Sequence, residues 1–571
     1  MSTTTAAAER PDIKHCPMVG WYDPLQLIQT GGDVAVSALF GRRADYRVVE
    51  ALVAPSREPD VPDADDKEDF WLDYVADTGD GWNSTYAIAR AVAQDQLQLA
   101  NPNGDAQVTR RGSVLILGGD AVYPVASRLE YKRRVVAPYE AALPCTDAPH
   151  PIVRAVPGNH DWYDSLASFT RLFCSREWFA GWKAKQTRSY FAIRLPRGWW
   201  LVGTDMQLDS DIDQAQVDYF KAIAEQMLPG DRVILCNAEP QWIYAHVYGQ
   251  SDPDYTEDNL AFLEDKIFES RIAVFLAGDL HHYRRHEAQD GRQKITAGGG
   301  GAFLHPTHGA DVSSLKDGFV LKHSFPSRET SQSLCWGNLL FLVRNPWFGA
   351  VSGILYMLTA WSAMTDVSKF HVSEVAAALA EVINAGIRNP VAAFWFVTLF
   401  LGFWLFTDTH SKWYRYVAGT IHASMHMLAA FLIGWGATYL TVSVLHLTFG
   451  GTGQLLLAGI LIIAGGWIAG SIIMGLYLLV SLNAFGRHSN EAFSALKIED
   501  WKNFLRMRID RHGNLTIFPV GIRRVPRKWK EVPTTRRGPR FEPDDPDATA
   551  PELIEPPIVV ALSTVRDKAS S

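Results

Sequence analysis

The sequence is poor in cysteine and has no apolar segment at its start. Only five cysteines occur in 571 residues, and no two are spaced as Cys-x-x-Cys: Cys16, Cys145, Cys174, Cys236 and Cys335. An odd, scattered set argues against a disulfide framework or a zinc knuckle and favours a reducing compartment. The segment from Met1 to Pro17 is small and polar, so we expect no cleavable signal peptide.

A basic excess is also missing. Lys and Arg number 54 against 62 Asp and Glu, which gives a formal net charge of -8. Because a nucleic-acid-binding surface needs a basic face, we expect no nucleic-acid partner. Charge is scarcest between residues 337 and 483, so the chain divides into a polar part and an apolar part, and its length requires at least two domains.

The apolar part contains runs long enough to cross a bilayer, which takes about 20 residues per helix. Three strong runs and one weaker run, the last from Pro346 to Met364, predict four spans: 391–406, 419–445, 455–482 and 346–364. A buried core in a soluble protein is the alternative, but three nearly uncharged runs have no polar face for water. Lys and Arg in the flanking segments place both termini and the polar part in the cytoplasm. We therefore expect a multi-pass protein of the inner (cell) membrane, with the bilayer as a partner.

Polar residues follow four apolar runs of the polar part, at the points where buried strands are expected to end. They are Asp77, Asp120, the triplet Asn159-His160-Asp161, and the pair Asp279 and His281. In open α/β sheets, catalytic and ligand-binding residues lie on the loops at the carboxyl ends of the strands. We therefore expect these side chains to form one metal-binding constellation.

This order of motifs resembles the calcineurin-like metallophosphoesterases, whose pattern is Asp-x-His, Gly-Asp, Gly-Asn-His-Asp or -Glu, a lone His, and Gly-His-x-His. The specific matches are Gly119-Asp120 and Gly158-Asn159-His160-Asp161, and the resemblance covers about half the chain, from near residue 68 to near 310. It implies a metallophosphoesterase-type α/β fold, in which a β-sandwich is flanked by helices. An all-α transmembrane bundle is expected to follow.

The resemblance also implies roles for the motif residues. Asp77 would bind a first metal together with His281, Asp120 would bridge two metals, and Asn159 would bind the second. His160 would be the acid-supplying or phosphate-contacting residue, oriented by Asp161. The implied reaction is attack of a metal-bound hydroxide on a phosphomonoester or phosphodiester.

Three positions depart from the family pattern. Gly79 stands where the first motif has His, the segment 237–240 lacks the lone His, and Asp279 stands where the last motif has its first His. We assign Asp279 to the second metal, with Glu239 and Asp80 as stand-ins and His282 as an alternative to His281. A set rich in carboxylates favours Mn²⁺, Fe²⁺ or Mg²⁺ over Zn²⁺.

Composition divides the chain into five parts. They are an N-terminal extension (1–67), a phosphoesterase-like domain (68–330), the transmembrane region (337–483), a C-terminal hairpin segment that docks on the soluble domain (484–537), and a Pro- and acid-rich tail expected to be disordered (538–571).

The leading hypothesis is a membrane-anchored phosphoesterase with two divalent metal ions and a phosphoester substrate, lipid-linked by preference. The alternative is a catalytically impaired relative that acts as a binding or regulatory module, since three histidines of the pattern are missing.

Overall fold

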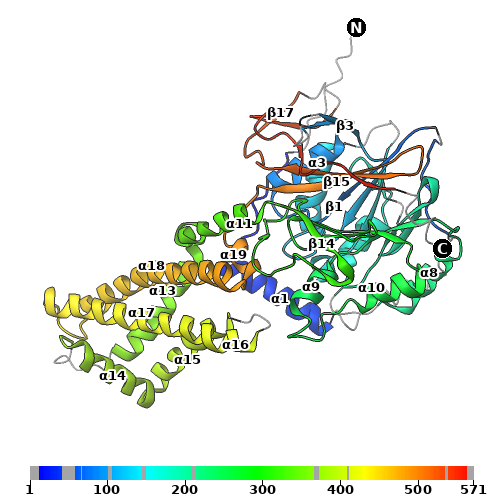
Figure 1. The fold of residues 1–571 in the computed structure, drawn as a ribbon. Helices are drawn as coiled ribbons and strands as arrows, with labels where there is room; N and C mark the ends of the chain where they lie inside the picture. The colour runs from blue at the N-terminus through cyan, green and yellow to red at the C-terminus, as the bar shows by residue number, and fades with distance from the viewer. Residues whose placement is uncertain are drawn as a thin grey trace, which may run out of the picture.

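The computed structural model describes residues 12–40, 58–65, 67–100, 104, 106–144, 150–184, 186–207, 212–364, 372–407, 411–533 and 538–561. Cys145 and the first 11 residues lie outside this range. An α/β body and an elongated helical bundle make up the described part (Figure 1).

Two β-sheets form the centre of the body. The first has the order β19-β16-β15-β1-β4-β5-β7-β6, with β20 also paired to β16. Its strands are β1 (Phe70–Val75), β4 (Val114–Gly118), β5 (Ile152–Val156), β6 (Trp178–Phe179), β7 (Trp182–Ala184), β15 (Lys502–Ile509), β16 (Leu515–Ile522), β19 (Glu552–Leu553) and β20 (Ile558–Val560).

The second sheet has the order β14-β12-β13-β11-β10-β9-β8. Its strands are β8 (Phe191–Arg194), β9 (Trp199–Gly203), β10 (Arg232–Cys236), β11 (Ile272–Ala277), β12 (Tyr283–Glu287), β13 (Gln293–Ala297) and β14 (Val320–Phe325). Two short hairpins, β2 (Gln96–Leu99) with β3 (Gln107–Arg110) and β17 (Trp529–Glu531) with β18 (Phe541–Pro543), stand apart.

The sheets pack face to face, and helices cover their outer faces. Leu72 and Tyr74 of the first sheet share one apolar core with Leu201, Ile234 and Leu276 of the second. The outer face of the first sheet is covered by α3 (Trp82–Ala93), the π-helical η2 (Tyr131–Val136) and α5 (Ala137–Ala142), and that of the second by α8 (Gln214–Ala224), α9 (Gln241–Tyr248) and α10 (Asp258–Phe262). The body is thus the helix-flanked sandwich that the sequence predicts.

Parallel strands place the motif loops on one side of this sandwich. β1, β4 and β5 run parallel in the first sheet, and β9, β10, β11 and β13 run parallel in the second. These strands are buried on both faces, which is why they read as continuous apolar runs. Their carboxyl ends carry the loops that begin at Asp77, Asp120, Asn159 and Asp279.

The C-terminal hairpin extends the first sheet, because β15 pairs antiparallel with β1 from Phe70↔Ile509 to Tyr74↔Leu505. The tail differs from the expectation of disorder where it is described, up to residue 561. Its strands β19 and β20 pair with β16, and Ile554, Ile558 and Val560 are buried between the sheets. These few apolar side chains outweigh the acidic, proline-rich composition around them.

Four helices of the bundle run lengthwise (Figure 1): α13 (Pro346–Met364), α15 (Pro390–Leu405), α17 (Thr420–Tyr439) and α18 (Thr452–Phe485). Among the described residues, three helical segments are long and apolar enough to cross a membrane, namely Pro346–Met364, Lys412–Val444 and Thr452–Phe485. The strong run predicted at 391–406 differs: α15 has 16 residues and meets α14 (Val375–Arg388) at a bend of 100°. Pro390 lacks the N–H that would continue α14, and Asn389 caps the new helix through Val391 N and Ala392 N.

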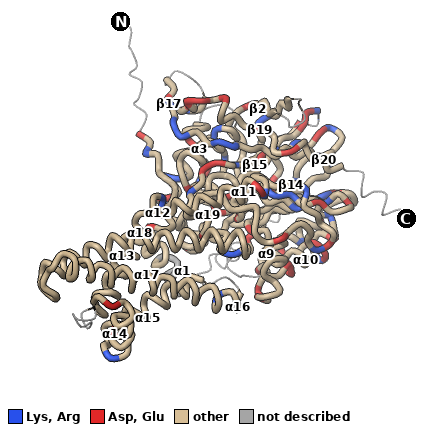
Figure 2. The backbone as a smooth tube through the Cα atoms, turned by 60° about the vertical axis from the view of Figure 1, so that its left-hand side comes forward, with Lys and Arg blue, Asp and Glu red and all other residues tan. Residues whose placement is uncertain are grey.

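Charge is distributed as the hydropathy predicts. Figure 2 shows Lys, Arg, Asp and Glu spread over the body, whereas α13, α15, α17 and α18 are almost free of them. The chain enters the bundle at α13 and leaves it at the end of α18, and both points lie beside the body (Figure 1). Because α13 and α17 lead away from the body and α18 returns, α15 is the element that brings the chain back between them.

Candidate active site

Three aspartates at strand ends carry the site. Asp77 follows β1, Asp120 follows β4 and Asp279 follows β11, and their φ angles are 57°, 45° and 64°. The left-handed region costs a non-glycine residue about 1 kcal/mol or more, and such strain gathers at functional sites. The turn after β11 lies against the Asp77 side chain, since the Asp279 N–H donates to Asp77 Oδ1 at 3.0 Å and Oδ2 at 2.8 Å.

Glycines let the backbone approach these carboxylates. A Cβ on Gly278 or Gly298 would lie 2.5 or 2.4 Å from Asp77 Oδ2, and one on Gly158 would lie 2.0 Å from Asp120 Oδ1. Gly298 begins the four-glycine run of the sequence. The run lies against the site, where a Cβ on Gly300 would lie 2.3 Å from the Ala76 carbonyl oxygen.

The Tyr123 hydroxyl lies at the centre of the cluster. It is 3.1 Å from Asp77 Oδ1, 3.1 Å from Asp120 Oδ2 and 2.9 Å from His281 Nε2. His281 Nδ1 lies 2.7 Å from the Phe303 carbonyl oxygen, so Nδ1 carries the proton of the neutral ring and Nε2 is an acceptor. When both carboxylates are ionised, the one proton of Tyr123 faces three acceptors, a buried deficit of donors that a cation, or protonation of the carboxylates, would relieve.

Sequence reasoning missed two residues here. The motif pattern assigns no role to Tyr123, whereas its hydroxyl contacts three of the predicted ligands. The pattern also leaves out His305, whereas its ring stacks on His281 with centroids 3.9 Å apart. The spacing Gly119-Asp120-x-x-Tyr123 was the available signal for the tyrosine; no signal in the sequence marks His305.

Asn159 and Asp279 have aromatic partners. Asn159 Nδ2 donates to the Tyr163 hydroxyl at 3.3 Å, and its Oδ1 accepts the His160 N–H at 3.0 Å. The Tyr244 hydroxyl donates to Asp279 Oδ2. Both residues are half-buried at the rim of the cluster, where their oxygens could reach a cation.

His160 and Asp161 do not form the expected pair. His160 Nδ1 lies 2.6 Å from the Pro124 carbonyl oxygen, which leaves Nε2 as the acceptor of the neutral ring. Asp161 accepts instead from Gly158 N at 2.9 Å, from Ala121 N at 3.1 Å and from the Tyr131 hydroxyl. Pro124 therefore fills the orienting role expected of Asp161, which ties the loops after β4 and β5 together.

The alternative ligands lie in different places. Asp80 is fully buried and accepts from Val19 N at 2.7 Å and Phe303 N at 3.2 Å, so it anchors two backbone segments rather than serving as a stand-in. Glu239 follows β10, is half-buried, and acts electrostatically on Tyr163 and Tyr244 at the rim. His282 is buried, and the Tyr123 hydroxyl contacts His281 rather than His282.

Burial and mutual repulsion dominate the electrostatics. Burial, followed by the charges of Asp120 and Asp279, raises the pKa of Asp77 well above its usual value. Burial and then Asp279 raise the pKa of Asp120 to about 8. Burial lowers the pKa of His281 well below its usual value. The aspartates thus repel one another in a buried site, and the nearby imidazole is neutral.

These side chains fit a hard divalent cation by their chemistry. Carboxylate, amide and phenol oxygens with one neutral imidazole are ligands of Mn²⁺, Mg²⁺ and Fe²⁺. Within the described residues, no three His, Cys, Asp or Glu side chains converge closely enough to hold a metal ion. The oxygens of Tyr123 and Asn159 are additional donors of the same site. Asp77 Oδ1 and His281 Nε2 are 3.8 Å apart, a separation that two ligands of one ion can have.

Comparisons with known proteins give distant likenesses. No known family model matches this sequence, and no curated protein matches it. Similar solved structures include GAP50, the anchor in the inner membrane complex of Plasmodium, with 12% identity and a TM-score of 0.32 over 45% of this chain and 82% of that one.

Two others are phosphatase-type structures. The purple acid phosphatase PPD1 from yellow lupin (Lupinus luteus) seeds has 14% identity and a TM-score of 0.31 over 43% of this chain and 46% of that one. PhoD has 10% identity and a TM-score of 0.29 over 47% of this chain and 63% of that one. The chain spans less than two thirds of either protein.

Proposed function

We propose that the chain is a membrane-anchored phosphoesterase that binds divalent metal ions, two by analogy with its motif pattern, at Asp77, Asp120, Asn159, Asp279 and His281. The observation that supports this most is the single Tyr123 proton among three acceptors, inside a group of buried aspartates that repel one another. Buried charge of one sign requires a counter-charge, and a bound cation supplies it.

The metal ions would supply positive charge to the phosphoryl oxygens and lower the pKa of water at the site. The side chains of the protein would hold the substrate and transfer the proton. Hydrolysis forms a phosphorus–oxygen bond to water, breaks the bond to the ester oxygen, and moves a proton to that leaving oxygen. His160 would have to be protonated at Nε2, with Nδ1 still donating to the Pro124 carbonyl, to give that proton to the leaving oxygen or to bind the phosphate.

A lipid-linked phosphoester is the substrate we favour. Trp21 packs against His160 with centroids 5.9 Å apart, while the adjacent Tyr22 packs against Phe341 and Phe348 at 5.0 and 5.8 Å. One short segment therefore touches both the site and the body-side end of the bundle. A phosphate at a membrane surface lies near such a site, whereas a soluble nucleotide gains nothing from the anchor.

Hydrolysis of aryl phosphomonoesters and phosphodiesters by the purified full chain tests the proposal. We expect turnover with Mn²⁺, none after chelation, and a loss of at least about 100-fold in Asp120→Asn, as for removal of a group that acts on developing charge. Asp265→Asn, a carboxylate remote from the site, is the matched control and should behave as the wild type.

The binding-module alternative rests on the missing histidines and on the open geometry of the present ligands. A normally folded protein that turns over neither substrate class with any of Mn²⁺, Mg²⁺ or Fe²⁺ would favour it. Efficient cleavage of soluble nucleotides with no action on lipid phosphoesters would remove the lipid preference alone.

A further inference from the structure

A polar pocket lies where α18 meets the body. Its volume is about 450 Å³, and its lining includes Arg328, Arg487, His246, His308, Leu482 and Phe485. We call it the α18 pocket. Among the described residues that line it, Asp311 is the only acidic one, so cations outnumber anions there.

The pocket is at the level where a bilayer surface is expected. Phe485 is the last residue of α18, the longest apolar helix. At the same end of the bundle Trp413 is 70% exposed, and the adjacent Tyr414 hydroxyl lies 2.7 Å from Ser481 Oγ, one turn before Phe485. Aromatic side chains of this kind sit at the headgroup level of membranes.

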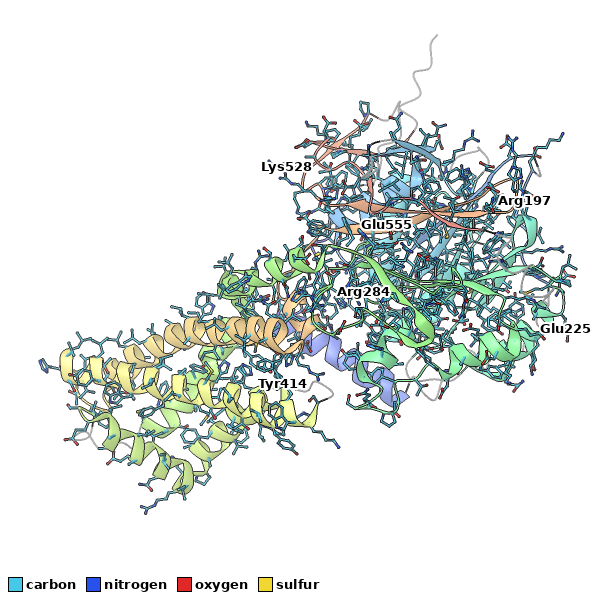
Figure 3. The ribbon with its side chains drawn as sticks, viewed as in Figure 1. Arg197, Glu225, Arg284, Tyr414, Lys528 and Glu555 are labelled. Carbon is cyan, nitrogen blue, oxygen red and sulfur yellow. The ribbon has the colours of Figure 1, made fainter. Side chains whose placement is uncertain are left out.

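A buried guanidinium lies behind the pocket. Arg284 is only 6% exposed, and its Nε atom has no hydrogen-bond partner within the described chain. Its Nη2 donates to the Thr307 carbonyl oxygen at 3.2 Å, next to His308 of the lining. Figure 3 labels Arg284 in the part of the body that faces the bundle. Burial, and secondly the positive charge of Arg328, lower the pKa of Arg284 to about 10.

The lining is divided by polarity. Leu482, Ala484 and Phe485 come from the membrane helix, and exposed Leu476 and Val480 continue the apolar track along α18. Arg328 comes from the body and Arg487 from the residues just after α18. A molecule with a phosphate at one end and hydrocarbon at the other matches both halves, since arginine binds phosphate oxygens through paired N–H groups.

We propose that the α18 pocket binds the phosphate of an anionic phospholipid from the bilayer around the helices. The headgroup phosphate lies between Arg328 and Arg487, and the acyl chains lie along α18. This site is separate from the aspartate cluster. The inference rests on membrane insertion of the bundle, which is part of the proposed function, and not on hydrolysis.

The test uses the detergent-solubilised full chain, stripped of lipid and titrated with phosphatidylglycerol or phosphatidylcholine, with bound lipid counted by native mass spectrometry. We expect one phosphatidylglycerol per chain to be held preferentially, and Arg328→Gln with Arg487→Gln to weaken it by about tenfold or more. Lys322→Gln with Lys221→Gln, which removes the same charge from the body, should leave binding unchanged. Arg328→Lys with Arg487→Lys should restore most of it.

Equal binding of phosphatidylglycerol by the wild type and the double glutamine variant would overturn the proposal. Displacement of the lipid by millimolar inorganic phosphate, with phosphate itself raising the unfolding midpoint, would identify a soluble anion instead. Mn²⁺-dependent hydrolysis of an aryl phosphodiester by the same samples reports separately on the aspartate cluster, so failure of one proposal is distinguishable from failure of the other.

Discussion

At the scale of single residues, the site contains more hydrogen-bond acceptors than donors. Tyr123 is the clearest case, because its hydroxyl faces two carboxylates and an imidazole acceptor. Asp77, Asp120 and Asp279 could be predicted as site residues because each follows an apolar run of the sequence. Tyr123 and His305 could not be placed in the same way, since their proximity depends on the path of the loops after β4 and β13.

Tyr123→Phe should weaken metal binding by about 10- to 100-fold, as loss of a group that orients ligands does. The ring would remain packed on His160, so the fold should persist. Metal content after dialysis against Mn²⁺ measures the effect. Tyr219→Phe, which removes a buried hydroxyl that accepts from Ala192 N at 3.0 Å far from the cluster, should keep its metal. Full occupancy in Tyr123→Phe would mean that the hydroxyl does not act on the ligands.

The raised carboxyl pKa values predict a pH dependence of stability. In the folded, metal-free protein the carboxyl pKa of Asp77 is raised well above its ordinary value of 3.8, and that of Asp120 is raised to about 8. Both groups therefore keep their protons at pH values where the unfolded chain has already released them. Stability is therefore complete below about pH 4 for these groups and is lost as the pH rises to about 8.

Unfolding midpoints of chelator-treated protein should accordingly fall between about pH 5 and about pH 8, and Mn²⁺ should reduce that fall by binding the ionised form. Thermal unfolding followed by circular dichroism checks this. Midpoints that rise over the same interval without metal would contradict the sign of the shifts.

At the scale of elements, the close packing of α13 on α18 relies on small residues. A Cβ on Gly353 would lie 2.5 Å from the Ile463 carbonyl oxygen, and one on Gly466 would lie 2.9 Å from Tyr356 Cβ. Contacts of this kind let two membrane helices approach closely. Nearby, the Tyr356 hydroxyl is 2.7 Å from His426 Nδ1, and His426 Nε2 is 3.2 Å from His422 Nε2. Tyr356, His426 and His422 thus form a chain of hydrogen bonds inside the bundle.

Gly353→Ala should destabilise the bundle by about 1–3 kcal/mol, because the backbone of α18 cannot move aside without losing contacts along its length. Gly402→Ala on α15 is the matched control, since nothing lies within 4 Å of its added Cβ. It should be neutral or stabilising by up to about 1 kcal/mol. Unfolding in detergent measures both, and equal midpoints for the two variants would contradict the close packing.

The bend between α14 and α15 shows where element prediction from sequence fails. Hydropathy predicts a run from residue 391 but does not show that the preceding residues 375–388 form a helix of their own. Pro390 and the Asn389 cap give the boundary, and the 100° angle arises from packing that no local pattern encodes. The tail strands β19 and β20 were missed for a similar reason, since they exist only by pairing with β16.

At the scale of the whole molecule, the body and the bundle are joined at one end. The chain enters α13 and leaves α18 beside the body, which fits an even number of crossings (Figure 1). We predict that a cysteine at Gly451, in the loop before α18, reacts with membrane-impermeant thiol reagents in intact cells, while one at Asp265 on the body does not. Labelling at Asp265 but not at Gly451 would mean that the protein has the opposite orientation in the membrane.

The most direct measurement of the central claim is a metal titration of chelator-stripped full chain, with hydrolysis of an aryl phosphodiester and bound Mn²⁺ followed in the same samples. The account predicts that turnover is absent without metal, rises as the aspartate cluster fills, and saturates when no more than two ions are bound per chain. A correctly folded protein whose turnover does not respond to metal, or which binds no ion at the cluster, would contradict it.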